Sequence, residues 1–249
     1  MSQEIPVRDR PDYGLDRPDF IIGGFVLGAI GLILGPILFF VLRMTILAYV
    51  LLVLFIFFIG ILGLTFGSMM YYGGKVGKLR ERDLVLSLIS WNGNEKVLDI
   101  GCGPGLLVVG AAKKLTTGKA VGVDMWDVKV ETGNTARAAL ENARIEGVSD
   151  RVEVKEGDVR NLPFDDGVFD IVLARALLNH IDEKSERKKS VQEIVRVMKP
   201  GGRLLIVIVD TWNSNKYLDL FKNYGLEDVK LSKSVTEFTR IISGMKKPI

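Results

Sequence analysis

One apolar stretch divides this 249-residue chain into two parts with different solvent requirements. Residues 20–72 contain one charged side chain, Arg43, whereas the rest has the mixed composition of a soluble domain. As a single helix the stretch would be about 75 Å long, far more than a hydrocarbon core of roughly 30 Å. We therefore expect a transmembrane helical hairpin over 20–70, with helices at about 20–42 and 44–70 and the turn near Arg43.

Basic residues flank this stretch on both sides. Three arginines lie within residues 1–19 and four basic residues lie within 75–82, whereas the turn carries Arg43 alone. Because basic flanks favour the cytoplasmic side of a membrane, we expect an integral, two-pass membrane protein. Both termini and the soluble domain should then be cytoplasmic.

Glycines recur on one face of each expected membrane helix. They are Gly24, Gly28, Gly31 and Gly35 in the first helix, and Gly60, Gly63 and Gly67 in the second. A turn near residue 43 brings Gly24 level with Gly63 and Gly28 level with Gly60. Small residues let helix backbones approach in lipid, so we predict close packing; the alternative is that glycine is simply common in membrane helices.

The remaining sequence alternates between strand and helix patterns. Residues 1–19 form a tail, 71–90 a linker with an amphipathic helix, and 91–249 the folded domain. Strands are expected at 96–100, 119–124, 151–155, 168–173, 203–209, 229–232 and 236–243. Helices are expected at 104–115, 134–146, 185–198 and 212–224. This alternation predicts an α/β, Rossmann-like, mostly parallel sheet with helices on both faces, closed by a pair of adjacent strands.

The segment V-L-D-I-G-C-G-P-G, residues 97–105, leaves a buried strand and enters a helix. Its glycines, Gly101, Gly103 and Gly105, allow a sharp turn and a close approach of ligand to backbone. Such a turn can serve NAD, FAD or S-adenosylmethionine. Residue 106 is Leu, so the dinucleotide spacing G-x-G-x-x-G is not met.

Two acidic residues follow later strands at the same expected edge of the sheet. Asp124 ends the second strand about 20 residues beyond the glycine turn, where a carboxylate accepts hydrogen bonds from ribose hydroxyls, as it also does in NAD sites. Asp158 follows the third strand and can accept from an adenine amino group, with Val159 against the ring. The alternative for Asp158 is a turn or helix cap.

Together and in order, these motifs and the later segments F-D-I-V-L and R-V-M-K-P-G-G-R-L-L-I resemble the class I S-adenosylmethionine-dependent methyltransferases. The resemblance runs from about Lys75 to Ile249 and is closest to methyltransferase type 11 and the ubiquinone/menaquinone C-methyltransferase branch. It implies a seven-stranded sheet whose last strand is antiparallel and lies beside the fifth.

The resemblance also implies roles for individual residues toward the cofactor S-adenosyl-L-methionine. Asp99, Gly101, Gly103 and Gly105 would hold the methionine end, Asp124 the ribose and Asp158 the adenine. The expected cofactor-binding set is Asp99, Gly101, Cys102, Gly103, Gly105, Asp124, Met125, Asp158, Val159 and Ala174. Ala174 and Arg175 would border the transferred methyl group.

Two residues are catalytic candidates. His180, the only histidine, follows the fourth strand and titrates near neutrality; it is a general base or a structural histidine bonded to backbone. Arg175 binds an acidic substrate group or a lipid phosphate, or forms a surface salt bridge. Cys102 is better suited to packing than to nucleophilic attack.

Composition excludes several classes of function. One cysteine cannot form an intrachain disulfide or a cysteine-rich zinc site, and no metal site is expected. A net charge of +3 without a basic run argues against nucleic acid as a partner. The oligomeric state is left open.

These observations predict methyl transfer to a small-molecule acceptor such as a lipid, a quinone or another amphipathic compound at the bilayer. One alternative is a membrane protein that binds S-adenosylmethionine without turnover, because no clear catalytic base is present. The other is a nicotinamide-dependent membrane oxidoreductase, against which the G-x-G-x-G spacing argues.

Overall fold

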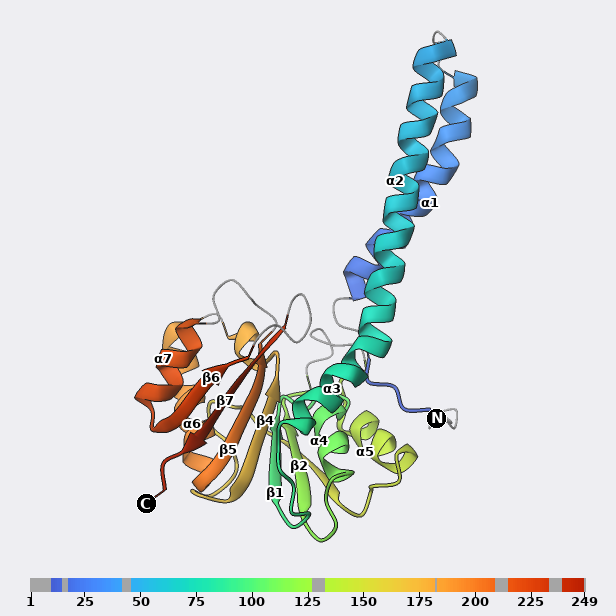
Figure 1. Cartoon of the computed structure of the whole chain (residues 1–249). Coiled ribbons are helices and arrows are strands. Elements are labelled where there is room, and N and C mark those ends of the chain that lie inside the picture. Colours follow the sequence, from blue (N-terminus) through green and yellow to red (C-terminus); the bar gives the residue numbers. More distant parts are fainter. Residues whose placement is uncertain are drawn as a thin grey trace. The chain divides into compact units, whose positions relative to one another are not determined.

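The computed structural model describes residues 10–14, 18–41, 46–126, 133–181, 183–208, 215–232 and 239–248 (Figure 1). These residues form two compact units, one helical and one α/β. The α/β unit includes the end of the N-terminal tail, up to Tyr13.

The helical unit is an antiparallel pair, α1 (Pro18–Val41) and α2 (Ile46–Tyr72). A Cβ atom on Gly24 would lie 3.1 Å from the carbonyl oxygen of Gly63, and one on Gly28 would lie 3.2 Å from that of Gly60. The predicted pairing of these glycines is therefore confirmed, and only hydrogen in place of a side chain allows so close a backbone contact. The turn near Arg43 lies outside the described residues.

The helix that begins with α2 does not end near residue 70, the expected end of the hairpin. Residues Gly73–Gly77, expected to be a linker, form a π-helical turn that runs into α3 (Lys78–Ser87). The continuous helix Ile46–Ser87 is long and apolar enough to cross a membrane, whereas the apolar helix Asp19–Leu34 is shorter. One of the two expected spans thus meets this criterion among the described residues.

The α/β unit is built on a seven-stranded sheet with strand order β3-β2-β1-β4-β5-β7-β6. The strands are β1 (Lys96–Ile100), β2 (Lys119–Asp124), β3 (Val152–Glu156), β4 (Phe169–Arg175), β5 (Met198–Ile208), β6 (Leu226–Leu231) and β7 (Arg240–Lys246). β7 lies between β5 and β6 and is antiparallel to both. The expected α/β fold and the position of the last strand are confirmed.

Helices cover both faces of this sheet because the strands are apolar on both sides. Val97 belongs to the cluster with α3, α4 (Leu106–Ala112) and α5 (Ala136–Ile145), whereas its neighbour Leu98 belongs to the cluster with α6 (Lys184–Val197) and α7 (Asn215–Asn223). Successive side chains point to opposite faces of a strand. A parallel sheet buried on both faces follows.

The packing of α3 on α4 depends on Gly110. A Cβ atom there would lie 2.5 Å from Cδ of Arg82 and 2.8 Å from Cδ1 of Leu86. Gly110→Ala should therefore destabilise the full-length protein by about 1–3 kcal/mol, because the buried α3 side chains must move. Chemical denaturation in detergent measures this effect. Gly77→Ala is the control, since its added Cβ meets nothing within 4 Å; equal stabilities of the two variants would contradict this prediction.

Candidate functional site

The glycine-rich segment forms the turn between β1 and α4, at the carboxyl edge of the parallel strands. The amide of Gly101 donates to the carbonyl of Val123 over 2.8 Å, which fastens the turn to β2. Gly105 caps α4 with a φ of +94°. A Cβ atom there would lie 3.1 Å from Val109 and 3.3 Å from Ala139. Glycine is required by both the backbone angle and the space, and α4 begins two residues later than expected.

Asp124 ends β2 and binds this turn through its side chain. Its Oδ2 accepts a hydrogen bond from the amide of Gly103 at 2.9 Å. Its Oδ1 accepts from the amide of Trp126 at 2.7 Å and from Nδ2 of Asn134 at 3.3 Å. A carboxylate has about four acceptor positions, so capacity for a ribose hydroxyl remains.

Asp99 lies beneath the turn, one residue before the end of β1, and is only 1% exposed. Its Oδ2 accepts from the amide of Val108 at 2.9 Å, whereas its buried Oδ1 has no hydrogen-bond partner among the described residues. Burial, with a further contribution from the charge of Asp124, raises the pKa of Asp99 to about 8. An unpartnered buried carboxylate oxygen is costly and is satisfied by a cationic donor.

Two non-glycine residues at this edge have left-handed backbone angles. Trp126 has a φ of 57° just after β2, and Ala176 has a φ of 56° just after β4. Such conformations cost of order 1–3 kcal/mol and cluster at ligand sites. Their places beyond two strands that flank β1 agree with a site at this edge.

Asp158 lies two residues beyond β3 and is bound by Arg160. The amide of Arg160 donates to Oδ1 at 2.8 Å, and its Nε lies 2.8 Å from Oδ2. These hydrogen bonds lower the pKa of Asp158, which stays ionised. An adenine contact of Asp158 stays a prediction, because Arg160 competes for the same oxygens. Val159 is buried in the core cluster on the α6 and α7 face.

The residues expected around the methyl group differ in their surroundings. Ala174 is fully buried beside Ile100 of β1. Arg175 donates from Nε to Oε1 of Glu81 in α3 over 2.9 Å, and its side chain is 16% exposed. The structure therefore gives Arg175 a salt bridge, but a largely buried one with Glu81 instead of the expected surface pair. His180 ends the short 3₁₀ helix Leu177–His180, and its side chain lies outside the described part of the structure.

The other two candidates, Cys102 and Met125, differ in burial. Cys102 is buried against Gly122, whose added Cβ would lie 2.7 Å from the Cys102 sulfur. Met125 follows Asp124 and is 55% exposed. Cys102 therefore packs the turn onto β2, whereas Met125 is available to a ligand.

Sequence reasoning missed Glu81, Asn142 and Arg160. Glu81 and Arg175 are 94 positions apart, and nothing in their local sequence pairs them. Asn142 is a fully buried amide inside a helix with an ordinary amphipathic pattern. Only Arg160 had a local signal, because a basic residue two positions after an acid can fold back onto it in a turn.

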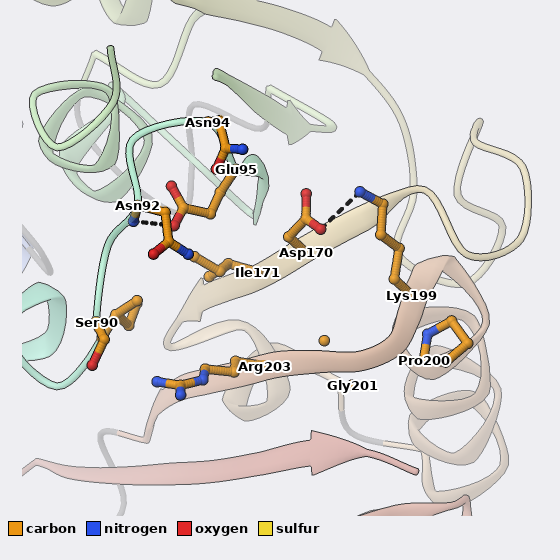
Figure 2. A pocket seen from close by; sticks show the side chains of 12 residues that line it. Ser90, Asn92, Asn94, Glu95, Asp170, Ile171, Lys199, Pro200, Gly201 and Arg203 are labelled. Atoms are coloured by element: carbon orange, nitrogen blue, oxygen red, sulfur yellow. Dashed lines mark hydrogen bonds and ion pairs between the residues drawn. The ribbon is translucent and has the colours of Figure 1, made fainter. Parts of the chain in front are cut away.

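A polar cavity of about 320 Å³ lies at the opposite edge of the sheet (Figure 2). Its lining includes Glu95, Asp170, Lys199 and Arg203, which precede or begin strands β1, β4 and β5. Lys199 forms an ion pair of 2.7 Å with Asp170 there. Ligands of open α/β sheets bind beyond the carboxyl ends of strands, so this cavity is not the candidate site.

The residues at the carboxyl edge suit a sulfonium nucleoside that carries an ammonium group. The unpartnered Oδ1 of Asp99 fits the ammonium, and Asp124 has capacity for hydroxyl donors. A Cβ atom on Gly101 would lie 3.3 Å from Cδ1 of Leu177, so this position leaves little room for a side chain.

Comparison with known proteins agrees with this geometry. Residues 98–206 match the family model described as "Methyltransferase domain". This segment is a methyltransferase-like domain. The family match supports S-adenosyl-L-methionine as the cofactor.

Two curated relatives are similar over about half of this chain. Demethylmenaquinone methyltransferase of Lactiplantibacillus plantarum is 31% identical over 125 residues, which cover 50% of this chain and 49% of that protein. The chloroplastic 2-phytyl-1,4-beta-naphthoquinone methyltransferase of Arabidopsis thaliana is 33% identical over 138 residues, which cover 53% and 49%. This chain spans about half the length of each of these two relatives.

The fold is also found in a solved structure from Aquifex aeolicus, described as a SAM dependent methyltransferase. It aligns with a TM-score of 0.55 and 18% identity, and the alignment covers 68% of this chain and 90% of that one. At this identity the likeness concerns the fold, a Rossmann-like methyltransferase fold.

The buried carboxylate of Asp99 should make stability depend on pH. Its folded-state pKa of about 8 lies above an unfolded value of about 3.9, so folding takes up a proton between these values. Wild-type stability should fall as pH rises through this window, by at most about 1.4 kcal/mol per pH unit. Asp99→Asn should lose this slope.

Denaturation of the full-length protein without ligand, at several pH values between about 5 and 8, measures the slope. The exposed Asp150 provides the control variant Asp150→Asn, which should retain the wild-type dependence. Parallel curves for wild type and Asp99→Asn would contradict the assignment.

Proposed function

We propose that this protein transfers a methyl group from S-adenosyl-L-methionine to a small-molecule acceptor at a membrane, such as a lipid, a quinone or another amphipathic compound. One observation carries this proposal. The glycine turn is hydrogen-bonded to Asp124, and it follows the strand that carries the unpartnered carboxylate oxygen of Asp99. This combination offers acceptors for the ammonium group and for the ribose of the cofactor at one edge of the sheet.

The protein's part in such a reaction is to bind, orient and exclude water. When bound, the cofactor supplies an activated methyl group. Asp99 would hold the ammonium group and Asp124 the ribose, while the glycine turn leaves room for close contact with backbone. Buried Ala174 provides an apolar wall at the end of β4. Fixed orientation of the two reactants supplies much of the rate of such a displacement.

Two observations support an amphipathic acceptor. The chain joins the α/β unit to the apolar helices α1 and α2. Because such helices are soluble in a lipid bilayer, an acceptor that partitions into the bilayer would be available to the protein. Two relatives are named for demethylmenaquinone and for a phytyl-naphthoquinone, which are quinones.

A transfer assay tests the proposed activity. Full-length protein in detergent is incubated with methyl-labelled S-adenosylmethionine and a membrane lipid extract, and label is counted in the organic phase. Asp124→Ala should weaken binding of S-adenosylhomocysteine roughly tenfold to hundredfold, because a charged hydrogen-bond acceptor is lost. The control Asp150→Ala, whose side chain is 73% exposed, should bind as the wild type does.

The outcomes separate the proposed function from its alternative. Label in a lipid-soluble product supports methyl transfer. Binding without any labelled product, in lipid or in water-soluble metabolites, would favour a cofactor-binding protein without turnover. Absence of binding by the wild type would overturn both.

We further propose that α1 and α2 cross the membrane as a two-pass hairpin, with both termini and the α/β unit in the cytoplasm. The basic residues on both flanks support this orientation. In a bacterial host, Ser87→Cys places a thiol at an exposed position of α3. An impermeant maleimide should label it only after the cells are opened. Labelling in intact cells would contradict the proposed orientation and place the α/β unit outside the cytoplasm. The native Cys102 is buried and gives the background.

A further inference from the structure

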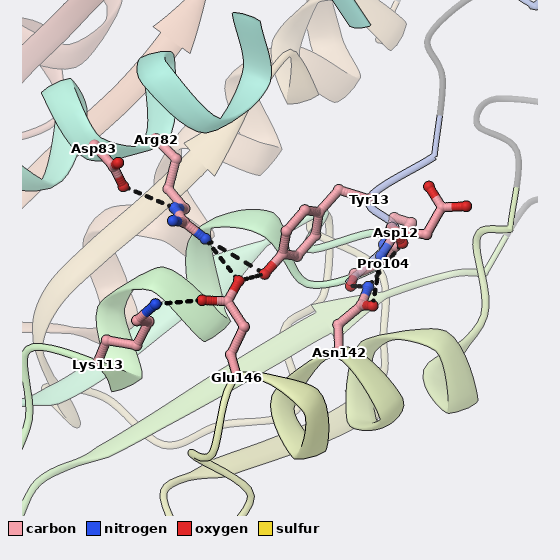
Figure 3. A network of polar contacts seen from close by, with 8 residues as sticks. All are labelled: Asp12, Tyr13, Arg82, Asp83, Pro104, Lys113, Asn142 and Glu146. Atoms are coloured by element: carbon pink, nitrogen blue, oxygen red, sulfur yellow. Dashed lines mark hydrogen bonds and ion pairs between the residues drawn. The ribbon is translucent and has the colours of Figure 1, made fainter. Parts of the chain in front are cut away.

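Asp12 and Tyr13 of the N-terminal tail lie on α5 and belong to the α/β unit (Figure 3). Tyr13 is only 6% exposed, and the guanidinium of Arg82 lies 5.8 Å from the centre of its ring. Although this tail precedes the hairpin in the sequence, it is part of the domain that follows the hairpin. Its contacts are polar and specific.

Asn142 joins the tail to the glycine turn through a fully buried side chain. Its Oδ1 accepts from the amide of Asp12 at 2.9 Å, and its Nδ2 donates to the carbonyl of Asp12 at 2.8 Å. The same Nδ2 donates to the carbonyl of Pro104 at 2.8 Å. One amide therefore pairs with the tail as a peptide group would, and with the residue between Gly103 and Gly105.

Glu146 lies four residues after Asn142 and binds the other end of the contact. It accepts hydrogen bonds from the hydroxyl of Tyr13, from Nη1 of Arg82 at 2.9 Å and from Nζ of Lys113. Burial alone would raise the pKa of Glu146, but these donors hold it below its usual value. Burial and Glu146 raise the pKa of Tyr13 far above its usual range, so its hydroxyl keeps its proton and donates.

These five residues, Asp12, Tyr13, Arg82, Asn142 and Glu146, form what we call the tail clasp. Tyr13 lies before α1, and Arg82 lies after α2. The clasp therefore gathers both chain segments that flank the hairpin onto one helix, α5. Asn142 and Glu146 share a face of this helix because they are four residues apart.

We propose that the tail clasp belongs to the cofactor-binding machinery, with Asn142 as a positioning residue that couples docking of the tail to the shape of the glycine turn. This inference rests on the proposed function, since it assumes that the turn binds S-adenosylmethionine. By this inference the N-terminal tail does more than precede the hairpin, because it completes the support of the site.

The physical basis is that two side chains hold the middle of the turn, at Gly103 and Pro104. Gly103 is held by Asp124 and the carbonyl of Pro104 by Asn142, while proline has no amide hydrogen to add a bond of its own. Gly103 and Gly105 have φ values of 51° and 94°, and glycine has more alternative conformations than any other residue. Without Asn142 and the docked tail, the turn would sample more of these conformations, and binding would have to order it.

Thermodynamic linkage requires that the coupling between tail docking and ligand binding acts equally in both directions. If a docked tail favours the binding-competent turn, a bound ligand must favour the docked tail by the same factor. The amide of Asp12 reports this directly, because it exchanges with solvent only when its bond to Asn142 opens.

The experiment uses full-length protein in detergent and S-adenosylhomocysteine as the probe. Calorimetry gives its dissociation constant, and hydrogen exchange of the peptide containing Asp12 and Tyr13 is followed with and without it. In the wild type, the probe should slow exchange of this peptide. Asn142→Ala should weaken binding roughly tenfold and abolish the ligand-dependent slowing.

Three further variants separate coupling from general stability. Tyr13→Phe keeps the buried ring but loses the bond to Glu146, so it should weaken binding less than Asn142→Ala does. Arg144→Ala removes only an exposed pair with Glu141 on the same helix and should bind as the wild type does. Gly244→Ala crowds Cδ2 of Leu226, 2.9 Å from the added Cβ, where β7 packs on β6 away from the clasp, and its ligand-dependent slowing should persist even if its stability falls.

Each outcome is decisive. Tight binding by the wild type without any change in exchange at Asp12 would overturn the inference and leave the proposed function standing. Wild-type affinity in Asn142→Ala would do the same. Failure of the wild type to bind the probe would overturn the proposed function and, with it, the inference.

Discussion

Strand β1 lies between β2 and β4, and its parallel register with both determines where the site residues can lie. Ile100 pairs with Val123 on one side and with Ala174 on the other. The three strands therefore end at the same edge, and the chain must leave each of them there. The glycine turn and Asp124 meet because of this register, as the hydrogen bond between Gly103 and Asp124 shows.

The burial that stabilises this sheet also leaves a polar group of β1 without a hydrogen-bond partner in the described part of the chain. Strands that are apolar on both faces bury their backbone and any polar side chain among them. Asp99 is such a side chain, and the amide of Val108 satisfies only one of its two oxygens. Burial raises the pKa of Asp99, and a cationic ligand at its free oxygen would favour the ionised form. Titratable groups shifted in this way are common at functional sites.

The α5 helix links parts of the molecule that are remote in the sequence. Its buried face contacts the glycine turn through Ala139 and Asn142, and its end binds the tail and α3 through Glu146. Glu81 of α3 in turn binds Arg175 at the end of β4. The segments on either side of the hairpin are thus connected to the edge that carries the site by a short series of buried polar contacts.

Local pattern was enough to predict the strands, the glycine turn and the pairing of Gly24 with Gly63, because each depends on periodicity or on spacing along one element. The strand bounds of β1 and β2 are those expected, whereas α4 begins late because Gly105 adopts a left-handed angle. The partners of Arg175, Asp158 and Asn142 depended on the tertiary structure. Except for Arg160, those partners are distant in sequence and are chosen by which buried groups must satisfy one another, and a single sequence does not record that choice.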